Sequence, residues 1–120
     1  MELKIIHEKS SAIASFVPVK INWNIQPKND KVEDEYIIFK ENGSSVKIEL
    51  LFVPKNKRHL GLGKRILSSF IAYAKRLEYE SVELMVFPMD SGVTKEKLFE
   101  FYRSFGFENF SPSHMYLDLV

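Results

Sequence analysis

The sequence changes its hydrophobic period near its middle, and this change restricts the fold more than any other feature. Across residues 46–53 apolar side chains recur at every second position, which is the period of a strand. Across residues 62–77 they recur three and four apart, which is the period of an amphipathic helix. The β-forming stretch 81–87 follows. Residues 46–87 therefore predict a strand, a helix and a second strand parallel to the first.

Strict alternation assigns the side chains of residues 46–53 to two faces. Val46, Ile48, Leu50 and Phe52 are expected on one face, and Lys47, Glu49, Leu51 and Val53 on the other. On this interpretation Glu49 shares a face with Leu51 and Val53.

Three more strands are expected ahead of this unit. Leu3 and Ile5 alternate near the N-terminus, residues 17–25 alternate over a longer stretch, and residues 36–40 form an apolar run. Residues 26–35 are polar and rich in turn formers. The Asn42-Gly43 pair between residues 36–40 and the strand at 46–53 is a hairpin signal, because both residue types tolerate positive φ.

The C-terminal part predicts a second helix and a last strand. Thr94 can cap a helix whose apolar residues lie at helical spacing: Leu98, Phe101, Tyr102 and Phe105. Residues 115–119 alternate again as a strand. The expected fold is a mixed α/β (α+β) sheet, mainly antiparallel, with two main helices.

Length and composition limit the class of protein. With 120 residues, of which 45% are hydrophobic, residues 1–120 are expected to form a single domain. A net charge of +1 argues against binding nucleic acid or acidic membranes through overall charge. The absence of cysteine excludes thiolate chemistry, and three scattered histidines predict no metal site. No apolar run approaches the ~20 residues that cross a bilayer, so a cytoplasmic location is expected.

The stretch 53–65 has the composition of a phosphate cradle. It leaves a strand and enters a helix through Gly61 and Gly63, and it contains five basic residues: Lys55, Lys57, Arg58, Lys64 and Arg65. Backbone amides at a helix N-terminus favour a phosphate. The third glycine of a dinucleotide fingerprint is absent, because position 66 is Ile, and no P-loop motif is present. A solvated turn and a nucleic-acid phosphate track remain alternatives.

Two motifs resemble the GNAT superfamily of N-acetyltransferases. Arg58-His59-Leu60-Gly61-Leu62-Gly63 is similar to the family's Arg/Gln-x-x-Gly-x-Gly/Ala signature, and residues 101–108 (FYRSFGFE) resemble its Leu-Tyr-x-x-x-Gly-Phe ending of the last helix. The resemblance covers residues 46–120. The first 45 residues match poorly, which implies a shortened N-terminal region without the usual first two helices.

The resemblance implies acetyl transfer from acetyl-coenzyme A (acetyl-CoA) to a primary amine by direct attack. Backbone amides would hold the CoA pyrophosphate at Arg58, His59, Leu60, Gly61, Leu62, Gly63 and Lys64. Leu51, Phe52 and Val53 would pair with the pantetheine arm through their backbone. Tyr102 corresponds to the family's general acid, although its helical position also suits a core residue.

The acceptor amine must also lose a proton. Glu49 is the possible general base, with a solvated strand-edge charge as the alternative interpretation, and Glu83 or water alone could serve instead. The implied acceptors are a small-molecule amine, a protein lysine or a protein N-terminus. Asp30, Glu33, Asp34 and Glu35 could attract a cationic acceptor, or form only a solvated loop.

Two further alternatives stay open. A homodimer could cover an acceptor side left open by the short N-terminal region. The chain could also be a non-catalytic CoA-binding or interaction domain, or, less favoured, a nucleic-acid module using the basic residues of 55–65.

Overall fold

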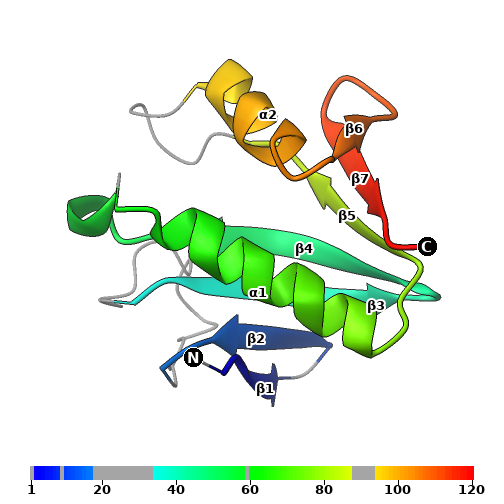
Figure 1. Cartoon of the computed structure of the whole chain (residues 1–120), viewed down its shortest axis with the longest axis horizontal. Helices are drawn as coiled ribbons and strands as arrows, with labels where there is room; N and C mark the ends of the chain where they lie inside the picture. The colour runs from blue at the N-terminus through cyan, green and yellow to red at the C-terminus, as the bar shows by residue number, and fades with distance from the viewer. Residues whose placement is uncertain (1, 9, 18–33, 59, 88–93) are drawn as a thin grey trace.

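The computed structural model describes residues 2–8, 10–17, 34–58, 60–87 and 94–120. They form a seven-stranded sheet with two α-helices on it (Figure 1). The strands are β1 (Lys4–Glu8), β2 (Ser11–Ser15), β3 (Tyr36–Asn42), β4 (Ser45–Phe52), β5 (Ser81–Met85), β6 (Glu108–Asn109) and β7 (His114–Asp118). The helices are α1 (Leu62–Arg76), α2 (Lys95–Arg103) and the short 3₁₀-helix η2 (Lys55–Lys57).

The sheet has the order β1-β2-β3-β4-β5-β7-β6, and only β4 and β5 pair in parallel. This arrangement confirms the predicted mixed, mainly antiparallel sheet and the crossover from β4 through α1 to β5. The hairpin between β3 and β4 turns through Gly43, whose φ is +64°. None of the described helices is long and apolar enough to cross a bilayer.

The N-terminal strands differ from the prediction. β2 occupies Ser11–Ser15, whose small alternating residues Ala12 and Ala14 give only a weak apolar period, so the sequence did not indicate it. The expected strand at 17–25 lies outside the described residues, except for Val17, which follows β2. The two-residue strand β6 was also not predicted. Most of the segment in which the usual first two helices are expected to be missing, residues 18–33, lies outside the described residues.

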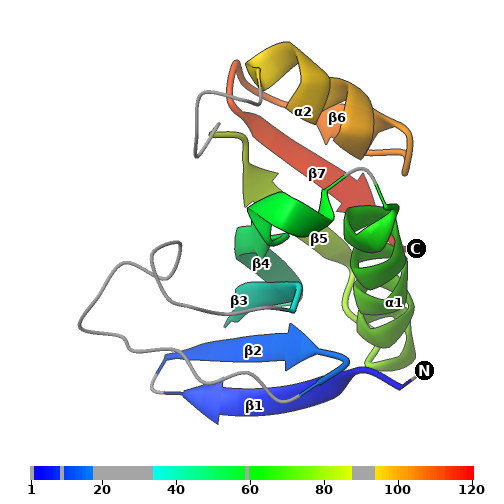
Figure 2. The same ribbon diagram turned by 90° about the vertical axis from the view of Figure 1, so that its left-hand side faces the viewer.

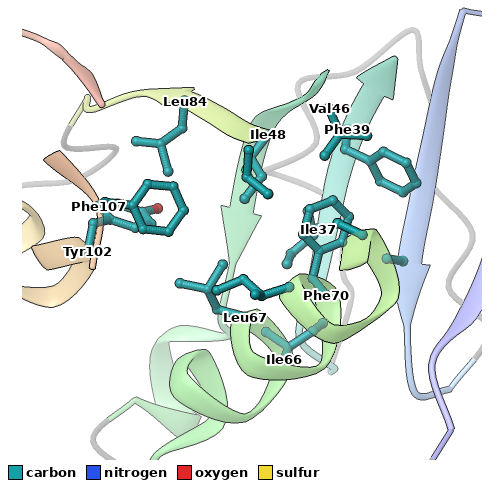
Figure 3. Packing of buried hydrophobic residues seen from close by; sticks show 14 of the residues in the cluster. Ile37, Phe39, Val46, Ile48, Ile66, Leu67, Phe70, Leu84, Tyr102 and Phe107 are labelled. Atoms are coloured by element: carbon teal, nitrogen blue, oxygen red, sulfur yellow. The ribbon is translucent and has the colours of Figure 1, made fainter. Parts of the chain in front are cut away.

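Both faces of the sheet carry apolar residues. The helix-side core joins inward residues of the strands with α1 and α2, as Figure 3 shows for Phe39, Ile48 and Phe70. Figure 2 shows α1 lying along one side of the sheet. On the opposite face, which we call the outer face, a second cluster consists of Ile13, Tyr36 and Ile38, with Ile6, Leu50 and Phe52 packed against them.

A β-bulge in β4 changes which side chains share a face. Ile38 pairs with Leu50 and Phe39 with Ile48, so Glu49 is the extra residue. One added residue shifts the alternation by one position. Ile48 and Leu51 therefore both belong to the helix-side core, while Leu50 lies in the outer cluster. The prediction that Ile48 and Leu50 share a face is wrong for this reason. The prediction that Glu49 shares a face with Leu51 is also wrong, because Glu49 bonds to Ser11 on the outer face while Leu51 packs in the helix-side core.

The same strand diverges from β5 just beyond its paired part. The parallel pairing runs from Ser45↔Ser81 to Ile48↔Leu84 and then stops, although β4 continues to Phe52 alongside β3. In Figure 1 the two strands lie together at one end and separate toward the start of α1. The predicted opening between parallel neighbours is thus present.

The contact between α1 and β3 supplies a test of the core. Phe70 is fully buried, and its ring centroid lies 4.9 Å from that of Phe39 in an edge-to-face arrangement. We expect Phe70→Ala to lower the free energy of unfolding by about 3–5 kcal/mol, since it removes a buried ring and leaves a cavity. Urea denaturation measures this loss. Ser68→Ala, on the exposed face of the same helix, should change stability by less than about 0.5 kcal/mol. Equal effects of the two substitutions would contradict the packing described.

Candidate active site

A cleft of about 600 Å³ opens where β4 and β5 diverge. Its walls are β4 beyond the paired segment, the end of β5, the first turn of α1 and one side of α2. The cleft therefore joins a strand, a helix N-terminus and a second helix at one place.

The N-terminus of α1 is open to an anion. Gly61 precedes the helix at φ +77°, a left-handed conformation that favours glycine, and no side chain caps the first turn. The first turn contains no acidic residue. Because the first amides of a helix have no partner within the helix, they can donate hydrogen bonds to a bound anion.

Gly63 allows the start of α1 to lie close to two other parts of the cleft. A Cβ atom there would stand 3.5 Å from Cζ of Phe101 on α2 and 3.6 Å from Cγ2 of Val53. A side chain larger than methyl would have to extend between these groups. Glycine thus keeps the cleft open beside the helix N-terminus.

Some of the residues predicted to hold the pyrophosphate line the cleft, and others do not. Those that line the cleft are Arg58, Gly61, Leu62, Gly63 and Lys64. Leu60 is 70% exposed and does not line it, and His59 lies outside the described residues. The Nε atom of Arg58 donates to the carbonyl oxygen of Val53 at 3.3 Å, so this side chain also connects the loop to the chain leaving β4.

The three residues predicted to pair with the pantetheine arm also differ in whether they line the cleft. Leu51 and Val53 line the cleft, whereas Phe52 does not. The Phe52 ring instead stacks on Tyr36 in the outer cluster, with centroids 5.0 Å apart. The bulge accounts for this difference, because it sets the alternation that sends Phe52 to the outer face.

Tyr102 is both a core residue and a cleft residue. It is 7% exposed, its ring lies edge-to-face against Phe107 and Phe101, and it lines the cleft. Figure 3 shows it beside Phe107, across from the β4 side chain Ile48. Burial raises the pKa of the Tyr102 phenol well above its ordinary value of 10.0. The phenol is therefore in its protonated form at neutral pH.

The two candidate bases differ in position. Glu49 is exposed, lines the cleft, and accepts a hydrogen bond from Ser11 Oγ to its Oε1 at 2.7 Å. Glu83 does not line the cleft, and its Oε2 accepts from Asn42 Nδ2 at 3.2 Å. Sequence reasoning did not find Ser11, because only the pairing of distant strands brings it near Glu49.

Two of the basic residues near the cleft, Lys57 and Arg65, lie beside acidic side chains. Arg65 Nη2 lies 2.8 Å from Oε1 of Glu35, which is only 5% exposed, and Arg65 also covers the Phe16 ring. Lys57 Nζ lies 3.9 Å from Asp34. Glu35 therefore does not belong to an exposed acidic surface, while Asp30 and Glu33 lie outside the described residues.

Comparison with known proteins gives different results for sequence and structure. The sequence matches no family model and has no significant match among curated proteins. An acetyltransferase from Bacillus subtilis, solved in complex with CoA, has a TM-score of 0.68 at 13% identity over 99% of both chains. The anti-CRISPR protein AcrVA5 has a TM-score of 0.63 at 22% identity, covering 74% of this chain and 95% of that one.

A third similar structure is the PaiA N-acetyltransferase from Thermoplasma acidophilum in complex with coenzyme A. Its TM-score is 0.56 at 22% identity, and the match covers 70% of this chain and 52% of that one. Other similar structures are described as members of the GNAT family. The chain therefore has the GNAT acetyltransferase fold, as the sequence motifs predicted.

The ion pair of Arg65 and Glu35 supplies a stability test for the edge of the site. We expect Arg65→Met to lower the free energy of unfolding by about 1–3 kcal/mol, because it leaves a buried carboxylate without its partner. The double variant Arg65→Met/Glu35→Gln should regain part of the lost free energy of unfolding, because it has no unpaired buried carboxylate. Lys64→Met, at the neighbouring exposed position, is the control. If Lys64→Met and Arg65→Met were equally stable in urea, the ion pair would have no structural role.

Proposed function

We propose that this chain is an N-acetyltransferase that transfers acetyl from acetyl-CoA to a primary amine by direct attack. The observation that carries the proposal is the cleft between diverging parallel strands, which has an open helix N-terminus at one side and the Tyr102 phenol in its wall. The CoA bound in the Bacillus subtilis and Thermoplasma acidophilum structures supports CoA as the ligand class.

The residues at the start of α1 fit a pyrophosphate. In the proposal, the uncapped amides that follow Gly61 donate to its oxygens, and the positive end of the helix dipole adds a favourable field. Lys64 lines the same part of the cleft and adds a positive charge. The first turn contains no acidic residue that would weaken this positive field.

The edge of β4 beyond its pairing with β5 fits an extended amide-containing chain. Beyond Ile48 its pairing with β5 has ended, while its other edge remains paired with β3 as far as Phe52. Backbone groups on such an edge can pair with a ligand as with another strand. Leu51 and Val53, which line the cleft, would contribute through their backbone and through apolar contact.

Tyr102 is the proposed general acid. Acetyl-CoA supplies a thioester, and formation of the new C–N bond breaks its C–S bond. Tyr102 donates its phenolic proton to the departing sulfur, which would otherwise leave as a thiolate. The raised pKa of this buried phenol keeps the proton available throughout the neutral range.

Glu49 is the proposed general base. A primary ammonium has a pKa near ~10 and must lose a proton before its nitrogen can attack. Glu49 accepts this proton, directly or through water, at the cleft wall. The Asn42 hydrogen bond of Glu83 and its position outside the cleft lining make it the weaker candidate. The proposed acceptors remain a small-molecule amine, a protein lysine or a protein N-terminus.

Calorimetry with CoA tests the first part of the proposal. We expect the unaltered chain to bind CoA, and Gly63→Leu to weaken binding at least about tenfold, because its side chain would enter the space between Phe101 and Val53. Ser68→Leu adds the same side chain to the exposed face of α1 and should leave the affinity unchanged.

Three outcomes distinguish the alternatives. The absence of CoA binding by the unaltered chain would contradict the proposal. A steep, salt-dependent affinity for oligonucleotides in that case would support a nucleic-acid module. CoA binding without turnover over a broad panel of amines would support a non-catalytic CoA-binding domain.

Substitution of Tyr102 tests the catalytic part. We expect Tyr102→Phe to lower kcat by roughly 10- to 10,000-fold while CoA affinity and the melting temperature change little, since the ring and its contact with Phe107 are kept. With its pKa raised, Tyr102 should also cause no loss of kcat between about pH 7 and about pH 9. Tyr73→Phe, a tyrosine of α1 away from the cleft, is the control. Unchanged turnover in Tyr102→Phe would assign Tyr102 to the core alone.

A further inference from the structure

A hydrogen bond connects the proposed base to β2, a strand whose residues do not line the cleft. Ser11 is the first residue of β2, and its Oγ donates to Oε1 of Glu49 on β4 at 2.7 Å. The two residues are 38 positions apart in the sequence. Strand β3 lies between β2 and β4, so this bond crosses a whole strand.

The sheet geometry explains why these two residues can meet. Adjacent strands lie about 4.8 Å apart, so a contact from β2 to β4 must cover about twice that distance, which needs a long side chain on one of them. Between them Phe39 pairs with Ala12 on one side and Ile48 on the other, and its ring lies in the helix-side core. Its ring therefore does not obstruct the outer face at this point.

Glu49 lies on the same side of the sheet as Ser11. Ser11 alternates with Ala12, a helix-side core residue, so Ser11 lies toward the outer face. Glu49 follows the helix-side residue Ile48, so ordinary alternation directs it to the outer face, where it bonds to Ser11 while also lining the cleft. The bulge then places Leu50 on the outer face as well.

The contact limits the freedom of an exposed carboxylate. The Glu49 side chain has several rotatable bonds and is exposed to solvent, so it would sample many rotamers without a partner. A hydrogen bond to an ionised carboxylate is stronger than one between neutral groups. A group that accepts a proton in a reaction needs its position fixed by neighbours that do not react.

We infer that Ser11 is a positioning residue, which holds Oε1 of Glu49 so that Oε2 accepts the proton of the acceptor ammonium. This inference rests on the proposed function. In the step, the N–H bond of the ammonium breaks, its electron pair stays on nitrogen as the nucleophile, and the proton forms an O–H bond at Oε2. Ser11 keeps its own proton throughout and does not touch the acceptor.

Ser11→Ala tests the inference against a closely matched control. We expect kcat to fall about 2- to 10-fold, the range for loss of one hydrogen bond, while KM for acetyl-CoA and CoA affinity stay unchanged. Ser11→Thr keeps a hydroxyl and should restore most of the rate. Ser44→Ala removes a similar hydrogen bond, Ser44 Oγ to Oε2 of Glu80 at 2.9 Å, at a position away from the cleft, and should not change kcat.

Two measurements separate positioning from a general structural effect. In the Glu49→Gln background, Ser11→Ala should cause no further loss of kcat, because its effect passes through the carboxylate. Three-bond NMR couplings of the Glu49 side chain should indicate one dominant rotamer in the unaltered chain and rotamer averaging in Ser11→Ala. This second measurement needs neither substrate nor turnover.

Several results would overturn the inference. Unchanged kcat in Ser11→Ala, additive losses with Glu49→Gln, or rotamer averaging already present in the unaltered chain would each contradict it. If Glu49→Gln retained full kcat while Tyr102→Phe lost it, the role of Ser11 would be refuted and acetyl transfer would stand. If the unaltered chain showed no CoA binding and no turnover, the proposed function would fail and the role of Ser11 with it.

Discussion

The end of parallel pairing between β4 and β5 is the feature on which the rest of the site depends. Four residue pairs hold the strands together from Ser45↔Ser81 to Ile48↔Leu84, and beyond them each strand follows its antiparallel neighbour. Parallel strands need a crossover, and α1 supplies it by starting at the open end of the pair. The first amides of α1, which have no partner within the helix, and the edge of β4 beyond its pairing with β5 are therefore brought to the same opening.

The two helices pack on the sheet at either side of that opening. Tyr102 of α2 and Leu67 of α1 belong to one core with Leu84 of β5, so packing fixes the helices on the same face of the sheet. Gly63 leaves room between the start of α1 and Phe101. The phenol of Tyr102 is buried by this packing, and the same burial raises its pKa. The packing that forms the core therefore also raises the pKa of the proposed acid.

Local sequence patterns were sufficient for the elements that frame the cleft and insufficient for details that depend on pairing between strands. The helical period of α1, the β-formers of β5 and the Thr94 cap, whose Oγ1 accepts from the Lys97 amide at 3.2 Å, are all readable from neighbouring residues. The bulge at Glu49 is not, because it is defined by the register of β3 against β4. This is why Ile48 was wrongly grouped on one face with Leu50 and Phe52.

The same limit applies to polar contacts. The pairing of Arg65 with Glu35 and the bond from Ser11 to Glu49 join residues 30 and 38 positions apart, and no local spacing indicates either. The Ser11–Ser15 strand was missed because Ala12 and Ala14 are small, although both are buried in the helix-side core. Small residues there carry little hydrophobic signal while still filling the sheet.

Backbone amide NMR during titration with CoA measures whether the ligand enters the opening between β4 and β5. We expect chemical-shift changes to concentrate at the edge of β4 around Leu51, at the amides of the first turn of α1 after Gly61, and on α2 near Tyr102. The amides of β1 and of the hairpin turn at Gly43 should remain unchanged. Changes centred on the outer cluster or on β6 and β7, with the α1 amides unaffected, would contradict this expectation.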